Sequence, residues 1–281
     1  MLAIEHVTKK YGKREALHGV SAQLECGVYG LLGANGSGKT TLLRCICGLF
    51  TLNEGMIRYK GESVDQSKQF RRDLGYLPQS FGMFYELTLF EMLDYFCAIK
   101  KVLPGNKRSE IDRVLRQVNL TDQKHMRVSS LSGGMIRRAG IAQALLGDPK
   151  IIIMDEPTSG LDPEERARFK SVIVDRKPDQ LILISTHIVE DVEASCDRVL
   201  VIHEGRFLFE GPCSDLKKVA MNKVTLVEQI NMDKIEGNPF VLKKIDTDKG
   251  TYCRVLTQDN HGLESVTPTL EDGYMCLIKG I

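Results

Sequence analysis

A glycine-rich tract near the amino terminus has the residue types and spacing of a loop that binds phosphate. Its residues are Gly33, Ala34, Asn35, Gly36, Ser37, Gly38, Lys39 and Thr40, followed by Thr41. The glycines let successive backbone amides face one phosphate group, and a following helix adds its positive end. Lys39 is placed to pair with the β- and γ-phosphates, and the Thr40 hydroxyl to bind Mg²⁺. The tract therefore predicts a site for a nucleoside triphosphate.

Two acidic residues supply further chemistry that such a site needs. Asp155 follows the apolar run 151–154, and parallel strands present ligands at their carboxyl ends. Its carboxylate is expected to hold the metal ion, and Glu156 to polarise an attacking water. By itself, Glu156 is equally well explained as a surface acid beyond a strand, but the neighbouring motifs favour the catalytic role.

The tract Leu131-Ser132-Gly133-Gly134-Met135 predicts a second anion site without a lysine. Ser132 stands at a helix start, and the two glycines leave backbone amides open. Taken alone, such a tract is more often only a helix cap. A phosphate site apart from the first makes sense if it serves another subunit.

The hydrophobic pattern predicts an α/β fold that positions these tracts. Strand-like runs at 2–7 and 16–24, with a turn-prone stretch between them, indicate a small antiparallel sheet. The apolar run 28–32 enters the phosphate loop, and residues 41–47 suit a packed helix. The continuous apolar runs 151–154 and 181–184 indicate a parallel sheet covered on both faces.

Helical spacing interrupts this core over residues 81–146, which we expect to form an inserted helical subdomain. Thr88 to Glu91 and Ser109 to Asp112 both resemble capping boxes. Asp162 and Pro163 mark another helix start. We expect an ATPase core over residues 1–212 and a small accessory α+β domain over 213–281.

Composition excludes several classes of protein. Lysine plus arginine number 38 against 37 for aspartate plus glutamate, so no net basic field favours a nucleic-acid partner. The eight cysteines show no zinc-site spacing and indicate reduced thiols. The amino terminus lacks the apolar core of a signal peptide, and no apolar run is long enough to span a bilayer. We expect a cytoplasmic protein.

The order of the motifs resembles that of the nucleotide-binding subunit of an ABC transporter. The matches are the phosphate loop at 33–40 (Walker A), Leu77-Pro78-Gln79 (Q-loop), Leu131 to Met135 (signature motif), Ile151 to Glu156 (Walker B), Ser159-Gly160-Leu161-Asp162 (D-loop), His187 (switch histidine) and Tyr11, which stands where the family has an aromatic residue that stacks on adenine.

This resemblance implies that the chain binds ATP and Mg²⁺ and acts as a dimer, homo- or heteromeric. Each ATP would lie between the phosphate loop of one subunit and the Ser132 tract of the other. Gln79 would contact Mg²⁺ or water, and His187 would hold the γ-phosphate. Transmembrane permease subunits would keep the protein on the inner face of the membrane. The tract from Thr267 to Tyr274 resembles the ending of exporter ATPases and favours export.

Some points stay open at the level of sequence. Met135 replaces the family's usual glutamine, which puts local contacts of the signature helix in doubt. The apolar cluster Phe81, Met83, Phe84 and Tyr85 suits core packing or a permease contact. An ABC-type ATPase of translation or DNA repair is the main alternative. A P-loop GTPase is disfavoured because Asn222-Lys223-Val224-Thr225 lacks the guanine-binding aspartate.

Overall fold

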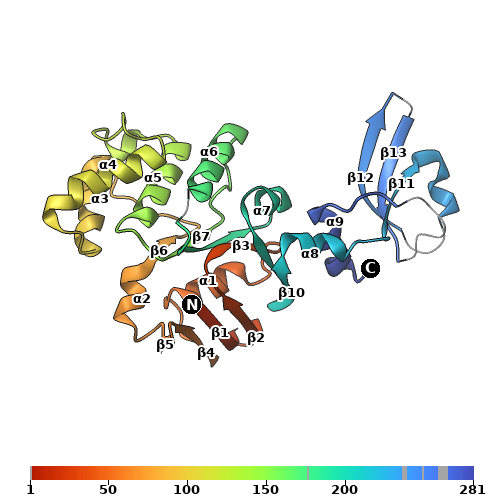
Figure 1. The fold of residues 1–281 in the computed structure, drawn as a ribbon, viewed down its shortest axis with the longest axis horizontal. Helices are drawn as coiled ribbons and strands as arrows, with labels where there is room; N and C mark the ends of the chain where they lie inside the picture. The colour runs from red at the N-terminus through yellow and green to blue at the C-terminus, as the bar shows by residue number, and fades with distance from the viewer. Residues whose placement is uncertain (1, 176, 236–238, 249, 259–264) are drawn as a thin grey trace. The chain divides into compact units, whose positions relative to one another are not determined.

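The computed structural model describes residues 2–175, 177–235, 239–248, 250–258 and 265–281 (Figure 1). The chain divides into two compact units, Met1–Phe207 and Leu208–Ile281, and the boundary falls within strand β10 (Arg206–Pro212). The first unit contains a mainly parallel sheet and an antiparallel sheet, and the second has an antiparallel sheet of its own. All the phosphate-site motifs predicted from the sequence lie in the first unit.

The first unit is built on a parallel sheet, as predicted. In order across the sheet, its parallel strands are β9 (Arg198–His203), β3 (Gly27–Leu32), β8 (Leu181–Thr186), β7 (Ile151–Asp155) and β6 (Leu74–Leu77). Every residue of β3, β7 and β8 is buried. Because both faces of the sheet are covered, these strands are apolar along most of their length, and the polar residues of β7 and β8 (Asp155, Ser185 and Thr186) come only at the carboxyl ends.

Side chains that alternate along each strand enter two different hydrophobic clusters. Ile151 and Ile153 of β7 join the cluster that includes helix α1 (Lys39–Ile46), whereas Ile152 and Met154 join the cluster of the helical segment. The first cluster also takes in an antiparallel sheet, in the order β2 (Arg14–Leu24), β1 (Leu2–Tyr11), β4 (Glu54–Tyr59) and β5 (Glu62–Ser63). The α/β architecture with a separate antiparallel sheet is confirmed.

The helical segment contains α3 (Leu89–Ile99), α4 (Lys107–Gln117) and α5 (Gly133–Leu145). The Thr88 capping box is confirmed, because Thr88 Oγ1 accepts from the Glu91 amide at 3.2 Å and Glu91 Oε2 accepts from the Thr88 amide at 2.8 Å. The predicted box at Ser109 is wrong. The 3₁₀ turn Pro104–Asn106 leads directly into α4, so Asn106 is the N-cap and the Ser109 hydroxyl donates to the Asn106 carbonyl at 2.8 Å.

Helix α5 lies unusually close to strand β6. A Cβ atom at Gly140 of α5 would stand 2.8 Å from Leu77 Cδ1, and a Cβ at Gly75 of β6 would collide with the Ala144 carbonyl. Glycine is needed at position 75 because the strand there contacts the backbone of the helix, whereas a Cβ at position 140 would press on the side chains of Leu77 and Phe81. Three shorter or peripheral helices complete this unit: α2 (Lys68–Asp73), α6 (Pro163–Val174) and α7 (Val189–Ser195). The predicted Asp162 cap of α6 is confirmed, with Asp162 Oδ1 accepting from the Glu165 amide at 2.9 Å.

In its described residues, the second unit is an antiparallel sheet with two α-helices and one 3₁₀ helix. Its elements are α8 (Cys213–Lys218), β11 (Val224–Glu228), η3 (Gln229–Lys234), β12 (Phe240–Thr247), β13 (Gly250–Leu256) and α9 (Leu270–Lys279), with the strands in the order β11-β13-β12. The tract that resembles exporter endings forms the start of α9. Thr269 and Asp272 make a capping box there, and Asp272 also accepts two hydrogen bonds from Arg254, at 2.9 and 2.6 Å.

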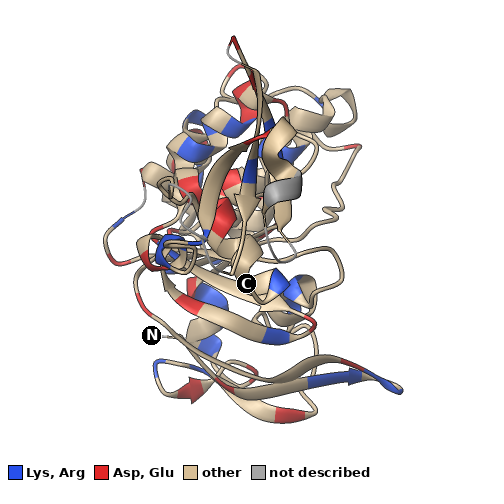
Figure 2. Ribbon diagram, turned by 90° about the vertical axis from the view of Figure 1, so that its right-hand side faces the viewer, with Lys and Arg blue, Asp and Glu red and all other residues tan. Residues whose placement is uncertain are grey.

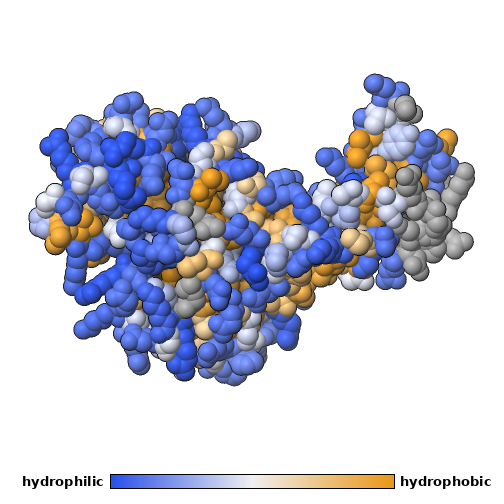
Figure 3. Space-filling model, viewed as in Figure 1, coloured by the Kyte–Doolittle hydropathy of each residue, from blue (hydrophilic) through white to orange (hydrophobic). Residues whose placement is uncertain are grey.

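The surface agrees with the balanced composition. Basic and acidic residues are interspersed along the chain (Figure 2). The visible face is mainly hydrophilic, with apolar residues at the end of the helical segment that carries α3 (Figure 3). Within the described residues, no helix has the length and apolar character to cross a membrane. All eight cysteines are in the thiol form, and burial raises the pKa of Cys45 to about 11.

Candidate functional site

The phosphate loop joins β3 to α1, and its backbone explains its glycines. Gly36 and Gly38 have φ angles of +81° and +111°, which side chains rarely tolerate. A Cβ at Gly38 would stand 2.9 Å from the Ala16 carbonyl, and one at Gly33 would collide with the Ile202 carbonyl. Gly38 is also the N-cap of α1 and has no side chain to occupy the first amides of the helix. Those amides are available to an anion.

The Lys39 side chain is held within the loop that precedes it. Its Nζ donates to the Gly33 carbonyl at 2.7 Å and the Ala34 carbonyl at 3.2 Å, and lies 3.3 Å from Glu156 Oε1. The Lys39 and Glu156 side chains are only 6% and 5% exposed. A buried cation needs a buried anion or carbonyl groups as partners, and Lys39 has both.

The ends of β7 and β8 carry the carboxylates and the histidine. Ser185 donates to Asp155 Oδ1 at 2.5 Å and accepts from the Glu156 amide at 2.9 Å, so it joins the two acidic residues. His187 Nδ1 lies 2.9 Å from Glu156 Oε2. Glu156 therefore has Lys39 on one carboxylate oxygen and His187 on the other.

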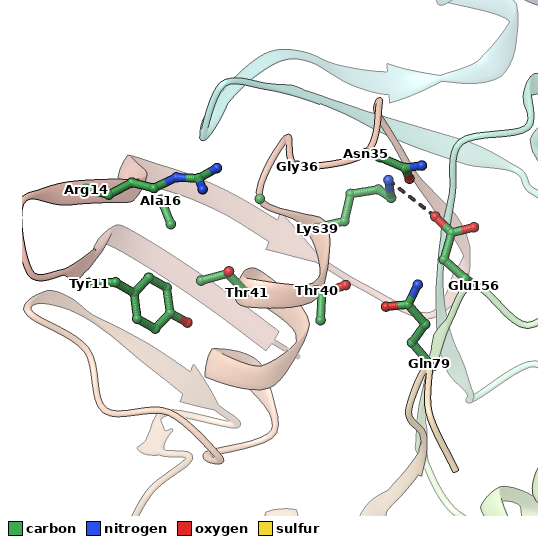
Figure 4. Close-up of a pocket in the computed structure, with 11 residues that line it drawn as sticks. Tyr11, Arg14, Ala16, Asn35, Gly36, Lys39, Thr40, Thr41, Gln79 and Glu156 are labelled. Atoms are coloured by element: carbon green, nitrogen blue, oxygen red, sulfur yellow. Dashed lines mark ion pairs between the residues drawn. The ribbon is translucent and has the colours of Figure 1, made fainter.

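A cavity of about 460 Å³ brings most of the predicted residues together (Figure 4). Its predicted members are Tyr11, Asn35, Gly36, Gly38, Lys39, Thr40, Thr41, Gln79 and Glu156. Tyr11 lies at one end and Gln79 and Glu156 at the other, with Lys39 and Thr40 between them (Figure 4). The spread from an aromatic ring to a cation and a carboxylate matches the order of base, phosphates and water in a bound nucleotide.

Tyr11 offers an aromatic surface at its end of this cavity. Its ring is 44% exposed and meets Phe50 edge-on at 5.9 Å between centroids. Lys9 Nζ lies 5.2 Å from the ring centroid. An exposed ring that is fixed by its neighbours suits stacking on a planar base.

The Ser132 tract lies elsewhere in the described structure, outside the residues that line this cavity. Ser132 caps α5 by accepting from the Met135 amide at 3.3 Å, and Ser132 and Gly133 are exposed. Met135 is half-buried and packs against the core of the helical segment. Its side chain therefore has a packing role, while the capping serine and the open start of α5 are retained.

Several residues around the site were missed by sequence reasoning. Arg14 and Ala16 line the cavity from β2, and their alternation along a strand was the available signal. Ser185, two residues before His187, was not predicted to contact the two acidic residues. Arg137 of α5 is the largest omission, because it donates to the backbone carbonyls of Gln79 and Asp155. Burial lowers the pKa of Arg137, and the charges of Asp155 and Glu156 oppose that effect.

The residues at the end of β7 fit a magnesium ion next to a triphosphate. Asp155 is fully buried, and among the described residues its Oδ2 atom has no hydrogen-bond partner; the same holds for the buried Ser37 Oγ. An unpaired buried carboxylate oxygen is costly unless a cation or water meets it. No group of three or more His, Cys, Asp or Glu side chains in the described part of the chain could hold a metal ion. Mg²⁺ commonly needs only one or two protein ligands, because phosphate and water supply the rest.

Comparison with known proteins agrees with this geometry. Residues 17–159 match the family described as ABC transporter. The uncharacterised ABC transporter ATP-binding protein YhaQ of Bacillus subtilis is 31% identical over 92% of this chain and 87% of its own. The Nod factor export ATP-binding protein I of Rhizobium meliloti is 36% identical over 89% of this chain and 73% of its own.

A solved structure extends the match to the fold. The dimeric ATP-binding cassette MJ0796, in a post-hydrolysis state bound to ADP and Pi, aligns with a TM-score of 0.68 and 25% identity. The alignment covers 75% of this chain and 98% of that one. The phosphate loop, the carboxylates after β7 and these relatives lead to one conclusion: the chain belongs to the ABC transporter family, as an ATP-binding subunit that hydrolyses ATP.

Proposed function

We propose that this ATPase drives export, and that two subunits close over ATP so that each nucleotide lies between the phosphate loop of one and the Ser132 tract of the other. The partner subunit is a second copy or a related chain. Residues 1–212 form the ATPase domain and 213–281 an accessory domain. The export role is supported by the Nod factor export relative and by the exporter-like tract at the start of α9.

The observation that carries the dimer proposal is the separation of two anion-binding features. The cavity contains Lys39 and the start of α1, whereas exposed Ser132 and Gly133 open the start of α5 elsewhere. Helix amides attract anions, but those of α5 have no lysine beside them in the tract. If a second subunit presented its bound nucleotide to the start of α5, that nucleotide would contact the phosphate loop of one subunit and the Ser132 tract of the other.

Within each site, Glu156, Lys39 and His187 have distinct roles in the attack of water on the γ-phosphate. Glu156 takes the proton of the water or orients it, because its carboxylate lies at the end of the cavity opposite Tyr11. Lys39 balances negative charge on the phosphates in the transition state. His187 holds Glu156 through the 2.9 Å contact and is placed to meet the γ-phosphate when the site closes.

Thr40, Asp155 and Gln79 are the residues that would hold Mg²⁺. The ion would neutralise phosphate charge and so favour attack. The chain prepares this position by burying the free oxygen of Asp155 and fixing the other through Ser185.

The permease contact is assigned to the segment after Gln79. Met83 is buried and Phe81 packs against the core, but Phe84 and Tyr85 are 45% and 52% exposed. The Phe84 ring meets Tyr95 of α3 at 5.2 Å. The exposed part of the cluster suits a protein partner, and such a partner would place the subunit at the inner face of the membrane.

The dimer proposal is tested with Ser132→Arg in a Glu156→Gln background. Glu156→Gln alone should bind ATP and form a dimer in its presence, measured by sedimentation. Adding Ser132→Arg should abolish the dimer while the monomer still binds ATP with unchanged affinity. Lys39→Ala is the control that loses ATP binding itself. If Ser132→Arg weakens ATP binding by the monomer as Lys39→Ala does, then the Ser132 tract serves its own site and the composite site is wrong.

A further inference from the structure

We propose that Arg137 is a positioning residue for ATP hydrolysis, which fixes the turn carrying Glu156 and the segment carrying Gln79 to helix α5. Hydrolysis would then depend on where α5 lies. This inference rests on the proposed role of Glu156, and it assigns to α5 a task within its own subunit's site, besides the one proposed for the partner's nucleotide.

The Arg137 guanidinium reaches backbone carbonyls of two separate segments. Its Nε donates to the Pro157 carbonyl at 3.0 Å, and its Nη1 to the Gln79 carbonyl at 3.0 Å. Its Nη2 donates to the Asp155 carbonyl at 2.9 Å and also to that of Glu156. A planar fork with five N–H groups can join such a set, and no other side chain offers that many donors in fixed directions.

The turn at Glu156 needs such support because its backbone is strained. Glu156 has φ of +50°, a left-handed conformation that costs a residue with a side chain free energy. Arg137 donates hydrogen bonds to the carbonyl of Glu156 and to those of its two neighbours, Asp155 and Pro157. The Glu156 amide donates to the Ser185 hydroxyl at 2.9 Å. The contacts of Arg137 and Ser185 with the Glu156 backbone thus help to fix the position of the Glu156 carboxylate.

The reach of Arg137 depends on the close packing of α5 on β6. Gly140, three residues along the helix, lets α5 approach Leu77 at the carboxyl end of β6. Residues 77 and 154 are neighbours in the sheet, so the segments after β6 and β7 leave it side by side. Arg137 can therefore span both segments from one helix position.

Ser132 caps the same helix, so α5 connects the Ser132 tract with the residues that Arg137 contacts. Arg137 lies little more than one turn after the Ser132 cap, so a shift of the helix start also moves the guanidinium. The four backbone carbonyls that Arg137 contacts would then either move with the guanidinium or lose their hydrogen-bond donor. The position of α5 is in this way transmitted to Glu156 and Gln79.

The test compares Arg137→Gln and Arg137→Lys with a control variant, Arg113→Gln, whose arginine contacts the other end of α5. Arg113 of α4 donates to the Leu145 carbonyl at 2.9 Å, away from the cavity residues, so Arg113→Gln removes a tie to the same helix. Arg137→Gln should lower kcat about 10- to 100-fold, the scale of misplacing a catalytic group. The Kd for ATP should stay within about threefold, because Arg137 is not among the residues lining the cavity in the described structure.

Arg137→Lys should recover part of the lost kcat, since an ammonium keeps the charge and can still donate to some of the carbonyls. It also serves as the test if the glutamine variant does not fold. Arg113→Gln should lower the melting temperature and leave the kcat of the folded protein unchanged.

Two results would overturn the inference: both Arg137 variants with wild-type kcat, or a loss of kcat that Arg113→Gln shares in proportion to its loss of stability. Glu156→Gln separates this failure from that of the proposed function. If Glu156→Gln hydrolyses ATP normally, the role of Glu156 is wrong whatever Arg137 does. If it is inactive while the Arg137 variants are normal, only the role of Arg137 is wrong.

Discussion

The ammonium of Lys39 lies 3.3 Å from the carboxylate of Glu156, and both side chains are almost completely buried. The cation expected to bind the phosphates thus already pairs with the residue expected to activate water. We therefore expect a γ-phosphate and Glu156 to compete for Lys39. A phosphate that drew the ammonium away would leave the Glu156 carboxylate free to accept a proton from water.

Glu156→Gln should separate binding from hydrolysis. The amide cannot accept a proton, so kcat should fall by at least about 100-fold. ATP affinity should be equal or higher, because a neutral group no longer competes for Lys39. Phosphate release and equilibrium ATP binding measure the two effects, and weaker binding by this variant would contradict the competition between Glu156 and phosphate.

Removing Lys39 should also destabilise the fold. Lys39→Ala leaves a buried carboxylate without its cation, which costs about 3 kcal/mol in buried pairs. Adding Glu156→Gln to Lys39→Ala should restore much of that stability, since the uncompensated charge is gone. Urea unfolding of the two single variants and the double variant gives the coupling, and simple additivity would show that the pair is not energetically linked.

Tyr11 should contribute to binding through the base and not through the phosphates. Loss of one aromatic stack costs about 1–3 kcal/mol per base, so Tyr11→Ala should weaken ATP binding about 5- to 150-fold. Tyr11→Phe keeps the ring and should bind normally. Inorganic triphosphate is the control ligand, and a Tyr11→Ala variant that weakens both ligands equally would argue against stacking.

The second unit should lose stability in acid through Asp272. Burial raises the pKa of Asp272, but hydrogen bonds from Arg254 and from Thr269 outweigh it and hold the pKa below the ordinary value of 3.8. The folded pKa is lower than the unfolded one, so the stabilisation is complete above pH 3.8 and is lost as the pH falls below it. Asp272→Asn should destabilise the unit at pH 7 and flatten this acid dependence. Fluorescence-monitored unfolding against pH measures both, and an unchanged acid limb in the variant would exclude Asp272 as its source.

The sequence predicts much of the fold because the central strands β3, β7 and β8 are buried along their whole length and are therefore mostly apolar. Strand β7 is buried at every residue, so its apolar run identified it without knowledge of its neighbours. The start of α4 was predicted too late in the chain, at Ser109, because the turn before the helix was not recognised. The Pro104–Asn106 turn sets the helix start, and Ser109 donates its hydroxyl to that turn instead of capping.

The site was harder to predict where contacts are made by backbone. Lys39 and Thr40 are recognisable because they stand at fixed places in the glycine-rich tract of residues 33–40, which is continuous in the sequence. Arg137 binds carbonyls, which every residue has, so no pattern of partner side chains marks it in the sequence. The close approach of α5 to β6, which brings Arg137 there, depends on Gly75 and Gly140 from distant parts of the chain.

The central claim is that the phosphate loop hydrolyses ATP productively only when another subunit closes over it. The most direct measurement is ATPase turnover per chain at saturating ATP over a dilution series, with the assembly state followed by sedimentation. Turnover per chain should rise with concentration and level off as dimers form, while Ser132→Arg stays low throughout. Constant turnover per chain in the range where sedimentation shows only monomers would contradict the claim.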